Sequence, residues 1–379
     1  MLAGQQAASP PRPPTSEQTF KNIQVLKGIP VDDFLQTMGI MSAALGIDCS
    51  ECHLNAGTEK VDWAADTPRK MIARKMVLMM TAINRDNFSG RQIVTCWSCH
   101  RGRDRPVTTP ALENVYGPGS QEMDDVLVEM PGQSSADEII NKYLDAIGGA
   151  ARLSNVKSYV ANGTSVGFGG LGGGGKVQIF AKFPDQRAMT IGFPEAPGRG
   201  DSIRVYNGRE GWQKTPLTVL AEYQLTGSDL DGARLDALLS FPGQIKQVLS
   251  NFRVSLPVTI SDLPGPSSQT GQDASAAAGQ DRLVNVVQGN GPRGMLATLY
   301  FDKESGLLVR VVRYGKSPIG RSPTQIDFGD YRDVGGIKMP FRILFAWLGG
   351  RDAIQLSEVQ TNVPIDNAIF GRPAASKGH

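Results

Sequence analysis

The sequence has few cysteines and histidines, little net charge and no long apolar run. Its 379 residues include 4 cysteines and 3 histidines, so a histidine-rich metal site is excluded. The 39 lysines and arginines nearly balance 37 acidic residues, for a formal net charge of +2, which does not favour nucleic-acid binding. No segment approaches the roughly 18 apolar residues that a membrane-spanning helix requires, so no membrane span is expected.

The few cysteines and histidines are concentrated in two motifs, CSECH at 49–53 and CWSCH at 96–100, and the remaining histidine is His379. CxxCH is the attachment sequence of c-type haem, because two thiols must reach the two vinyl groups while the adjacent histidine faces the iron. The sequence therefore predicts two covalent haem c groups as cofactors. The residues assigned are Cys49, Cys52, Cys96 and Cys99 for the covalent bonds, and His53 and His100 for the irons.

Other uses of paired cysteines fit this sequence less well. A zinc site with four thiolates would not require a histidine directly after each pair. Dithiol redox motifs belong to a thioredoxin-like βαβ context, and no such pattern is visible. A disulfide across two residues would be strained and would close a very small loop.

Methionine is the remaining candidate for the second axial position of each iron. Bis-histidine ligation would need His379 or a second chain, and the methionine thioether is the other common ligand. A methionine on a helix is often only a core residue, but six of the 12 methionines lie in two short segments of helical periodicity. We predict Met38 for the first haem and Met76 for the second, with Met41 and Met79 as the alternatives.

A helical segment is expected before each motif. The first starts at Pro30, has apolar residues at helical spacing and stops at Gly46. The second has Thr67 as N-cap and Pro68 as its first helical residue. The apolar stripe of this second helix comprises Ile72, Met76, Met79, Met80 and Ile83.

Three arginines near these segments are candidate contacts for the haem propionates, which are anions that a guanidinium binds well. They are Arg74, Arg101 and Arg103. The alternative is a solvated basic edge that attracts an acidic partner.

The composition divides the chain into several parts and favours a multidomain fold. We expect a small, mainly α dihaem c-type cytochrome domain, then an α+β domain with a large antiparallel, open β-barrel-like sheet. The boundaries are a proline-rich tail at 1–19, the cytochrome domain at 20–108, a linker at 109–135, and the β-rich domain at 136–372 with a mobile insertion at 264–281.

The second domain shows alternating apolar residues and frequent turns, which predict about ten strands. Helices are expected at 137–147, 230–237 and 242–250. The segment GLGGGGK at 170–176 matches a phosphate-binding loop only in part, since Val177 replaces the required Ser or Thr, so a glycine-rich turn is favoured. The expected strands are 156–166, 177–183, 186–191, 202–207, 283–288, 295–302, 307–314, 324–331, 339–348 and 353–362.

Residues 38–53, 73–76 and 94–102 resemble the cytochrome c subunit of photosynthetic reaction centres. In that family a helix supplies an axial methionine and a turn then leads to CxxCH. The resemblance implies that Met38, eleven residues before its cysteine, and Met76, in Ala-Arg-Lys-Met, are ligands. The full subunit carries four haems, whereas this chain has two motifs, so the resemblance implies electron transfer rather than a photosynthetic role.

The β-rich part resembles the unclosed β-barrel with lid helices of periplasmic lipoprotein-sorting carriers. The residues that resemble it lie at 306–310 and 327–341. Such barrels can hold an acyl chain, but the fold alone does not assign that function.

These features predict an electron-transfer protein rather than an enzyme, with redox proteins of unknown identity as partners. The β-domain would dock a partner or the cell envelope, within a membrane-associated complex or a homo-oligomer. The alternatives are a haem enzyme or gas sensor with one open iron, a structural subunit of a larger or polymeric assembly, and a carrier of hydrophobic ligands.

Covalent haem attachment takes place outside the cytoplasm, so we expect an exported protein in the periplasm, the cell envelope or the extracellular space. Residues 1–6 show neither a charged nor an apolar signal region. We therefore expect that a signal was removed or that the start is truncated.

Overall fold

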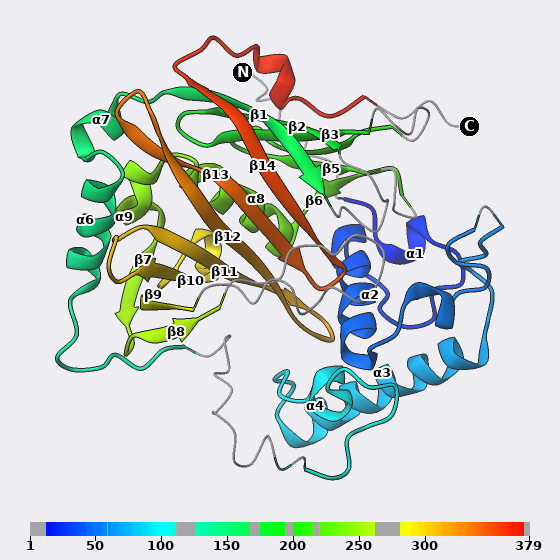
Figure 1. Cartoon of the computed structure of the whole chain (residues 1–379). Helices are drawn as coiled ribbons and strands as arrows, with labels where there is room; N and C mark the ends of the chain where they lie inside the picture. Colours follow the sequence, from blue (N-terminus) through cyan, green and yellow to red (C-terminus); the bar gives the residue numbers. More distant parts are fainter. Residues whose placement is uncertain are drawn as a thin grey trace, which may run out of the picture.

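The structure is a computed structural model that describes residues 13–58, 60–110, 112, 126–166, 175–193, 200–215, 220–261 and 281–374. Figure 1 shows a helical N-terminal part beside a large curved antiparallel sheet, which confirms the predicted fold class. The glycines at 170–174, most of the insertion at 264–281, most of the proline-rich tail and much of the linker lie outside the described residues.

The N-terminal part contains α1 (Ser16–Thr19), α2 (Val31–Leu45), η1 (Cys49–Glu51), α3 (Pro68–Asn87) and α4 (Cys96–His100). The predicted end of α2 is confirmed, because Gly46 caps this helix in the left-handed conformation with φ of 65°. The predicted start of α3 is also confirmed, since the Thr67 hydroxyl accepts a hydrogen bond from the Lys70 N–H.

The sheet has 14 strands, and its order is β6-β5-β4-β3-β2-β1-β14-β13-β12-β11-β10-β9-β7, with β8 pairing to β9. Among the described strands, β6 and β7 do not pair, so the sheet stays open. The strands β5, β6, β7 and β8 were not predicted, because segments of three to five residues show too little alternation. The strands are β1 (Ser158–Val166), β2 (Gly175–Lys182), β3 (Gln186–Gly192), β4 (Ser202–Tyr206), β5 (Gly211–Lys214), β6 (Glu222–Leu225), β7 (Ser250–Val254), β8 (Val258–Ile260), β9 (Arg282–Asn290), β10 (Leu296–Asp302), β11 (Leu308–Ser317), β12 (Gly320–Val334), β13 (Ile337–Trp347) and β14 (Gly350–Thr361).

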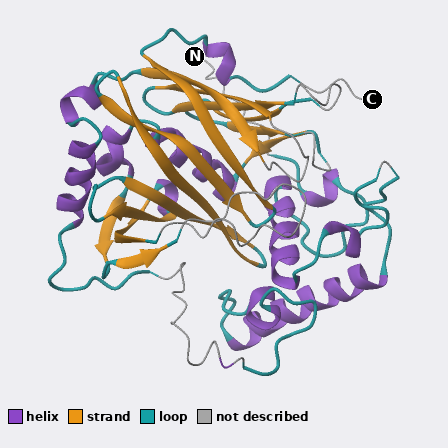
Figure 2. Ribbon diagram, viewed as in Figure 1, coloured by secondary structure: helices purple, strands orange, loops and turns teal. Residues whose placement is uncertain are grey.

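Helices lie against one part of the sheet (Figure 2). Their buried apolar residues and those of the sheet form the main core. These helices are α6 (Ala136–Ala146), α7 (Ala150–Ser154), α8 (Gly227–Leu239) and α9 (Ile245–Val248), with η3 (Pro242–Gln244), η4 (Pro292–Gly294) and η5 (Asn367–Phe370) as short turns. Fully buried residues such as Ile140, Leu235 and Leu299 join α6, α8 and β10 in one cluster. Within the described ranges, no helix is both long and apolar enough to cross a membrane.

The tip of the β11–β12 hairpin completes the core of the helical part. Ile319, at this tip, is 0% exposed and packs in one cluster with Ile40 of α2 and with Val77 and Met80 of α3. Nearby, the Gln92 amide donates a hydrogen bond to the Ser317 carbonyl at 2.9 Å. The helical part is therefore packed directly against the sheet.

A buried carboxylate forms a second contact between the two parts. Asp32, at the start of α2, accepts hydrogen bonds from the Thr226 hydroxyl at 2.6 Å and from the Thr226 N–H, at the N-cap of α8. Burial and, next, the Asp229 carboxylate raise the pKa of Asp32 to about 7. This contact fixes the first turn of α2 to the β-rich part.

Candidate haem sites

Each CxxCH motif folds as one helical turn. In the first, the His53 N–H donates to the Cys49 carbonyl at 2.9 Å, and η1 covers the intervening residues. The second motif is helix α4 itself, with Thr95 as its N-cap. Positions i, i+3 and i+4 share one face of a helical turn, so both cysteines and the histidine of each motif lie together. This arrangement suits two thioether bonds and one axial imidazole on a single macrocycle.

The two histidines are held differently. Nδ1 of His100 lies 3.0 Å from the Arg103 carbonyl, a bond that leaves Nε2 for an iron. Nδ1 of His53 is buried and has no hydrogen bond like the one between His100 and the Arg103 carbonyl. The His53 ring instead packs edge-on against Trp63, with ring centroids 5.1 Å apart. Burial and then the Lys70 ammonium lower the pKa of His53, while the Trp63 main chain acts in the opposite direction.

Helix α3 connects the two motifs. At its start, the Thr67 hydroxyl donates to the Cys52 carbonyl of the first motif at 2.7 Å. Near its end, the Asn84 side chain bonds the main chain of Val94, two residues before the second motif, at 2.7 and 2.8 Å. One helix of 20 residues thus fixes both motifs.

Ion pairs of Arg69 form a further connection between the two motifs. Arg69, in the first turn of α3, lies 3.4 Å from Glu51 of the first motif and 2.7 Å from Asp104, just after the second. The chain from Val94 to Asp104 therefore runs back along α3. Exposed pairs of this kind contribute about 1 kcal/mol or less, so they report proximity more than stability.

The candidate methionines fall into two groups. Met41 and Met80 pack in the cluster around Ile319, so their side chains already have a structural role. Met76 and Met79 are 37% and 47% exposed, although both lie on an apolar helical stripe. Met38 is partly exposed and does not belong to that cluster.

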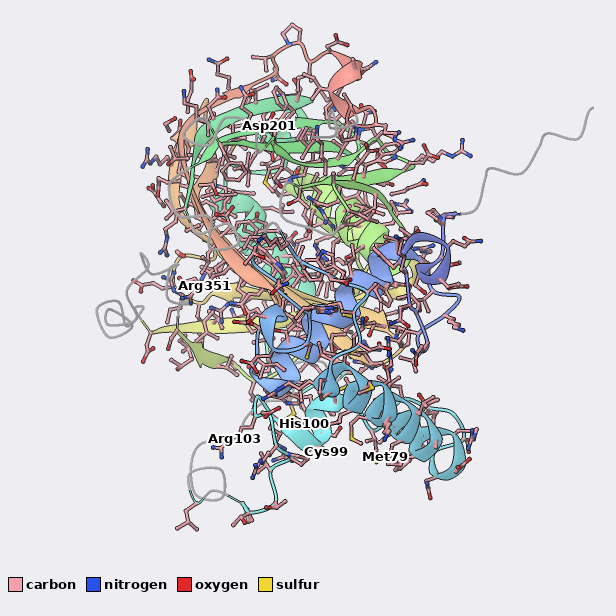
Figure 3. All side chains as sticks on the ribbon, turned by 90° about the vertical axis from the view of Figure 1, so that its right-hand side faces the viewer. Met79, Cys99, His100, Arg103, Asp201 and Arg351 are labelled. Atoms are coloured by element: carbon pink, nitrogen blue, oxygen red, sulfur yellow. The ribbon has the colours of Figure 1, made fainter. Side chains whose placement is uncertain are left out.

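The stripe predicted on α3 does not face the protein core, apart from Met80. The buried face of α3 comprises Val77, Met80 and Asn84. Apolar side chains are left exposed on α3, on the first motif and around the second, and a porphyrin is an apolar surface that would cover such groups. Figure 3 shows Met79 at the same end of the molecule as Cys99 and His100. The exposed apolar residues are Leu54, Met71, Ile72, Met76, Leu78, Met79, Ile93 and Trp97.

The arginines differ in availability. Arg74 lies 2.6 Å from Asp66, donates to the Asn22 carbonyl, and has a side chain only 11% exposed. The Arg74 guanidinium therefore already has partners within the helical part, and its contact with a propionate stays a prediction. Arg101 and Arg103 are exposed and, among the described residues, neither forms an ion pair. Arg103 lies beyond the second motif in Figure 3.

The four thiols do not converge on one centre. All four cysteines are free, and burial raises the pKa of Cys52 and Cys96. Over the described part of the chain, no group of three or more Cys, His, Asp or Glu side chains is close enough to hold a metal ion. The geometry therefore does not fit the four-thiolate zinc alternative, whereas each helical CxxCH fits a covalent haem.

Two residues of the first site were not predicted from the sequence. Trp63 contacts His53, and the Lys70 ammonium donates to the Trp63 and Ala65 carbonyls at 2.9 and 3.1 Å. Trp63 lies in a loop whose sequence shows no periodicity. From the sequence, Lys70 cannot be distinguished from other lysines and arginines on the surface. Only the tertiary structure brings them to the motif.

Comparisons of structure return proteins of low overall similarity to this chain. A LolA superfamily protein from Nitrosomonas europaea matches with a TM-score of 0.37 and 13% identity over 63% of this chain and 99% of its own. A DUF1329 family protein from Desulfovibrio piger matches with a TM-score of 0.38 and 10% identity over 63% of this chain and 98% of its own.

Comparisons of sequence concern the helical part. The photosynthetic reaction center cytochrome c subunit of Thermochromatium tepidum is 31% identical over 113 residues, which are 27% of this chain. The chain spans only 27% of the length of that relative. Residues 2–141 match the family described as photosynthetic reaction centre cytochrome C subunit. The predicted resemblance is therefore confirmed: residues 2–141 are similar to the cytochrome c subunits of photosynthetic reaction centres.

Proposed function

We propose that this chain is an exported dihaem c-type cytochrome that transfers electrons. Cys49 and Cys52 would hold one haem, and the second motif would hold the other through Cys96 and Cys99. Each haem supplies a one-electron ferric/ferrous couple when bound. The observation that supports this best is that every cysteine of the chain lies on a helical turn beside a histidine.

The residues around each motif support a closed axial site. The Arg103 carbonyl orients His100 so that Nε2 remains for the iron. On the opposite side we propose Met38 for the first haem and Met76 for the second, because neither side chain belongs to the buried cluster. Met79 stays as the alternative at the second site, since it shares the stripe of Met76. A thioether and an imidazole together leave no open position for a substrate or gas.

The packing supports electron exchange between the sites. Helix α3, the Arg69 ion pairs and the contact of α2 with α4 fix both motifs in one compact unit. Fixed ligands need little reorganisation when the charge of the site changes, which suits a carrier. The β-rich domain would then dock a redox partner or the cell envelope, in the periplasm or outside the cell.

Haem counting on cysteine variants tests this proposal. The full chain, produced in a host with a haem attachment pathway, should contain two haems. Cys49→Ala/Cys52→Ala and Cys96→Ala/Cys99→Ala should each contain one, as measured by alkaline pyridine spectra per mole of chain. A wild-type chain without covalent haem, or a double variant that keeps two, would overturn the proposal.

A further inference from the structure

The loop before α3 is fixed by one lysine. Lys70 donates from Nζ to the carbonyls of Trp63 and Ala65, at 2.9 and 3.1 Å, and its side chain is partly buried. Its own N–H bonds the Thr67 hydroxyl at the N-cap of α3. The lysine therefore joins the helix to the loop at two carbonyl acceptors, those of Trp63 and Ala65.

The same loop sets the orientation of His53. The Trp63 ring meets the His53 ring edge-on at 5.1 Å, and Nδ1 of His53 lacks the carbonyl bond that His100 makes with Arg103. Edge-on packing against the Trp63 ring therefore helps to hold this imidazole. Because Lys70 holds the Trp63 main chain, it acts on His53 through Trp63.

The charge of Lys70 is not neutralised at close range. Within the described residues Lys70 forms no ion pair, and its ammonium is held by carbonyl dipoles, although Asp62 and Asp66 exert an attraction on it. Solvent screens a partly buried charge less than an exposed one. The Lys70 Nζ lies 2.9 Å from the carbonyl of Trp63, whose ring contacts the His53 ring, so this cation lies close to the first motif.

From this arrangement we propose that Lys70 is a positioning residue of the first haem site and that its charge raises the reduction potential of that site. The inference rests on the proposed function. Adding one electron to an iron bound at His53 lowers the charge of the site, so a nearby fixed cation favours the reduced form. At the second site, His100 is contacted by the Arg103 carbonyl, and the Arg103 side chain is exposed.

Potentiometric titration of lysine variants tests the inference. The first site is isolated in the full chain by Cys96→Ala/Cys99→Ala, so that a single wave is followed optically. Lys70→Gln should shift this wave to lower potential, whereas Lys70→Arg, which keeps the charge, should stay near the parent. Lys75→Gln is the matched control, because Lys75 lies on the same helix and is exposed.

A further variant separates charge from packing. Trp63→Phe perturbs the contact with His53 but keeps the cation, so its shift should be smaller than that of Lys70→Gln. An unchanged potential in Lys70→Gln, or an equal shift in Lys75→Gln, would overturn the inference. Haem is counted first: a chain without haem overturns the proposed function, whereas a haem-loaded chain with an unchanged potential overturns only the role of Lys70.

Discussion

Gly46 and Gly102 pack backbone against backbone, and this contact joins the two CxxCH motifs. A Cβ at position 46 would lie 2.2 Å from the Gly102 carbonyl oxygen. The Gly102 N–H donates to the Ala44 carbonyl at 2.9 Å, and both glycines have positive φ. The end of α2, just before the first motif, therefore touches Gly102, two residues after the second motif.

This contact predicts a large effect of a single methyl group. Gly46→Ala should destabilise the protein by about 3 kcal/mol or more, since the left-handed conformation costs about 1–2 kcal/mol and a backbone clash is added. Gly28→Ala is the control, because Gly28 has φ of 75° but open space around it. Urea unfolding midpoints measure both variants. Equal losses in the two would contradict a close approach at Gly46.

The packing of Ile319, at the tip of the β11–β12 hairpin, predicts that the β-rich part stabilises the helical part. Ile319→Ala should lower the free energy of unfolding by about 2–5 kcal/mol, because it removes a fully buried side chain from the cluster of α2 and α3. Leu256→Ala, at a half-exposed position, should cost about 0.5 kcal/mol or less. Denaturant unfolding followed through haem absorbance measures the loss. If Ile319→Ala lowered the free energy of unfolding by less than about 1 kcal/mol, close to the loss expected for Leu256→Ala, the packing of Ile319 in this cluster would be contradicted.

The Asp32 contact predicts a pH dependence of stability. The carboxyl pKa is about 7 in the folded protein against a reference of 3.8, mainly because of burial. Between about pH 4 and 7 the folded protein therefore keeps a proton that the unfolded chain has released, and stability falls as pH rises. Asp32→Asn stays neutral throughout, so its free energy of unfolding should fall less steeply across this window.

A second variant checks the origin of that slope. Asp229→Asn removes the neighbouring charge that raises the Asp32 pKa but keeps the bonds to Thr226, so it should flatten the slope only in part. Asp33 and Asp352, whose pKa values are each raised to about 6 mainly by burial, leave a residual slope in wild type and in Asp32→Asn. Identical slopes for wild type and Asp32→Asn, from urea midpoints at several pH values, would show that Asp32 does not titrate as inferred.

The proposed axial ligands predict which methionine variants would open a haem iron to an external ligand. Met38→Ala and Met76→Ala should each let carbon monoxide bind one reduced haem, because alanine cannot coordinate. Met80→Ala serves as the control, since Met80 is buried among apolar residues and its loss should cost stability without opening an iron. A carbon monoxide shift in Met79→Ala, with none in Met76→Ala, would move the second ligand to Met79.

The fold and the motifs were predictable where the signal is local. The apolar spacing before Gly46 and the Thr67-Pro68 pair located α2 and α3, because caps and periodicity depend on nearby residues. Long alternating segments such as β12 and β13 were found for the same reason. The short strands β5–β8 were not predicted, since too few of their residues alternate between apolar and polar.

The contacts that shape the site could not be predicted in this way. Ile319 reads as an ordinary turn residue, yet it fills the core of helices some 240 to 280 positions earlier in the chain. Trp63 and Lys70 likewise meet His53 only through the tertiary fold. Neither periodicity nor motif spacing records which surfaces meet.

The most direct test of the account is a carbon monoxide difference spectrum of the dithionite-reduced full chain, with haem counted per chain. Two closed His/Met sites predict two haems and no spectral shift. One responsive haem would mean an open iron and would favour a haem enzyme or gas sensor. No haem in material from a competent host would contradict the assignment of the two CxxCH motifs.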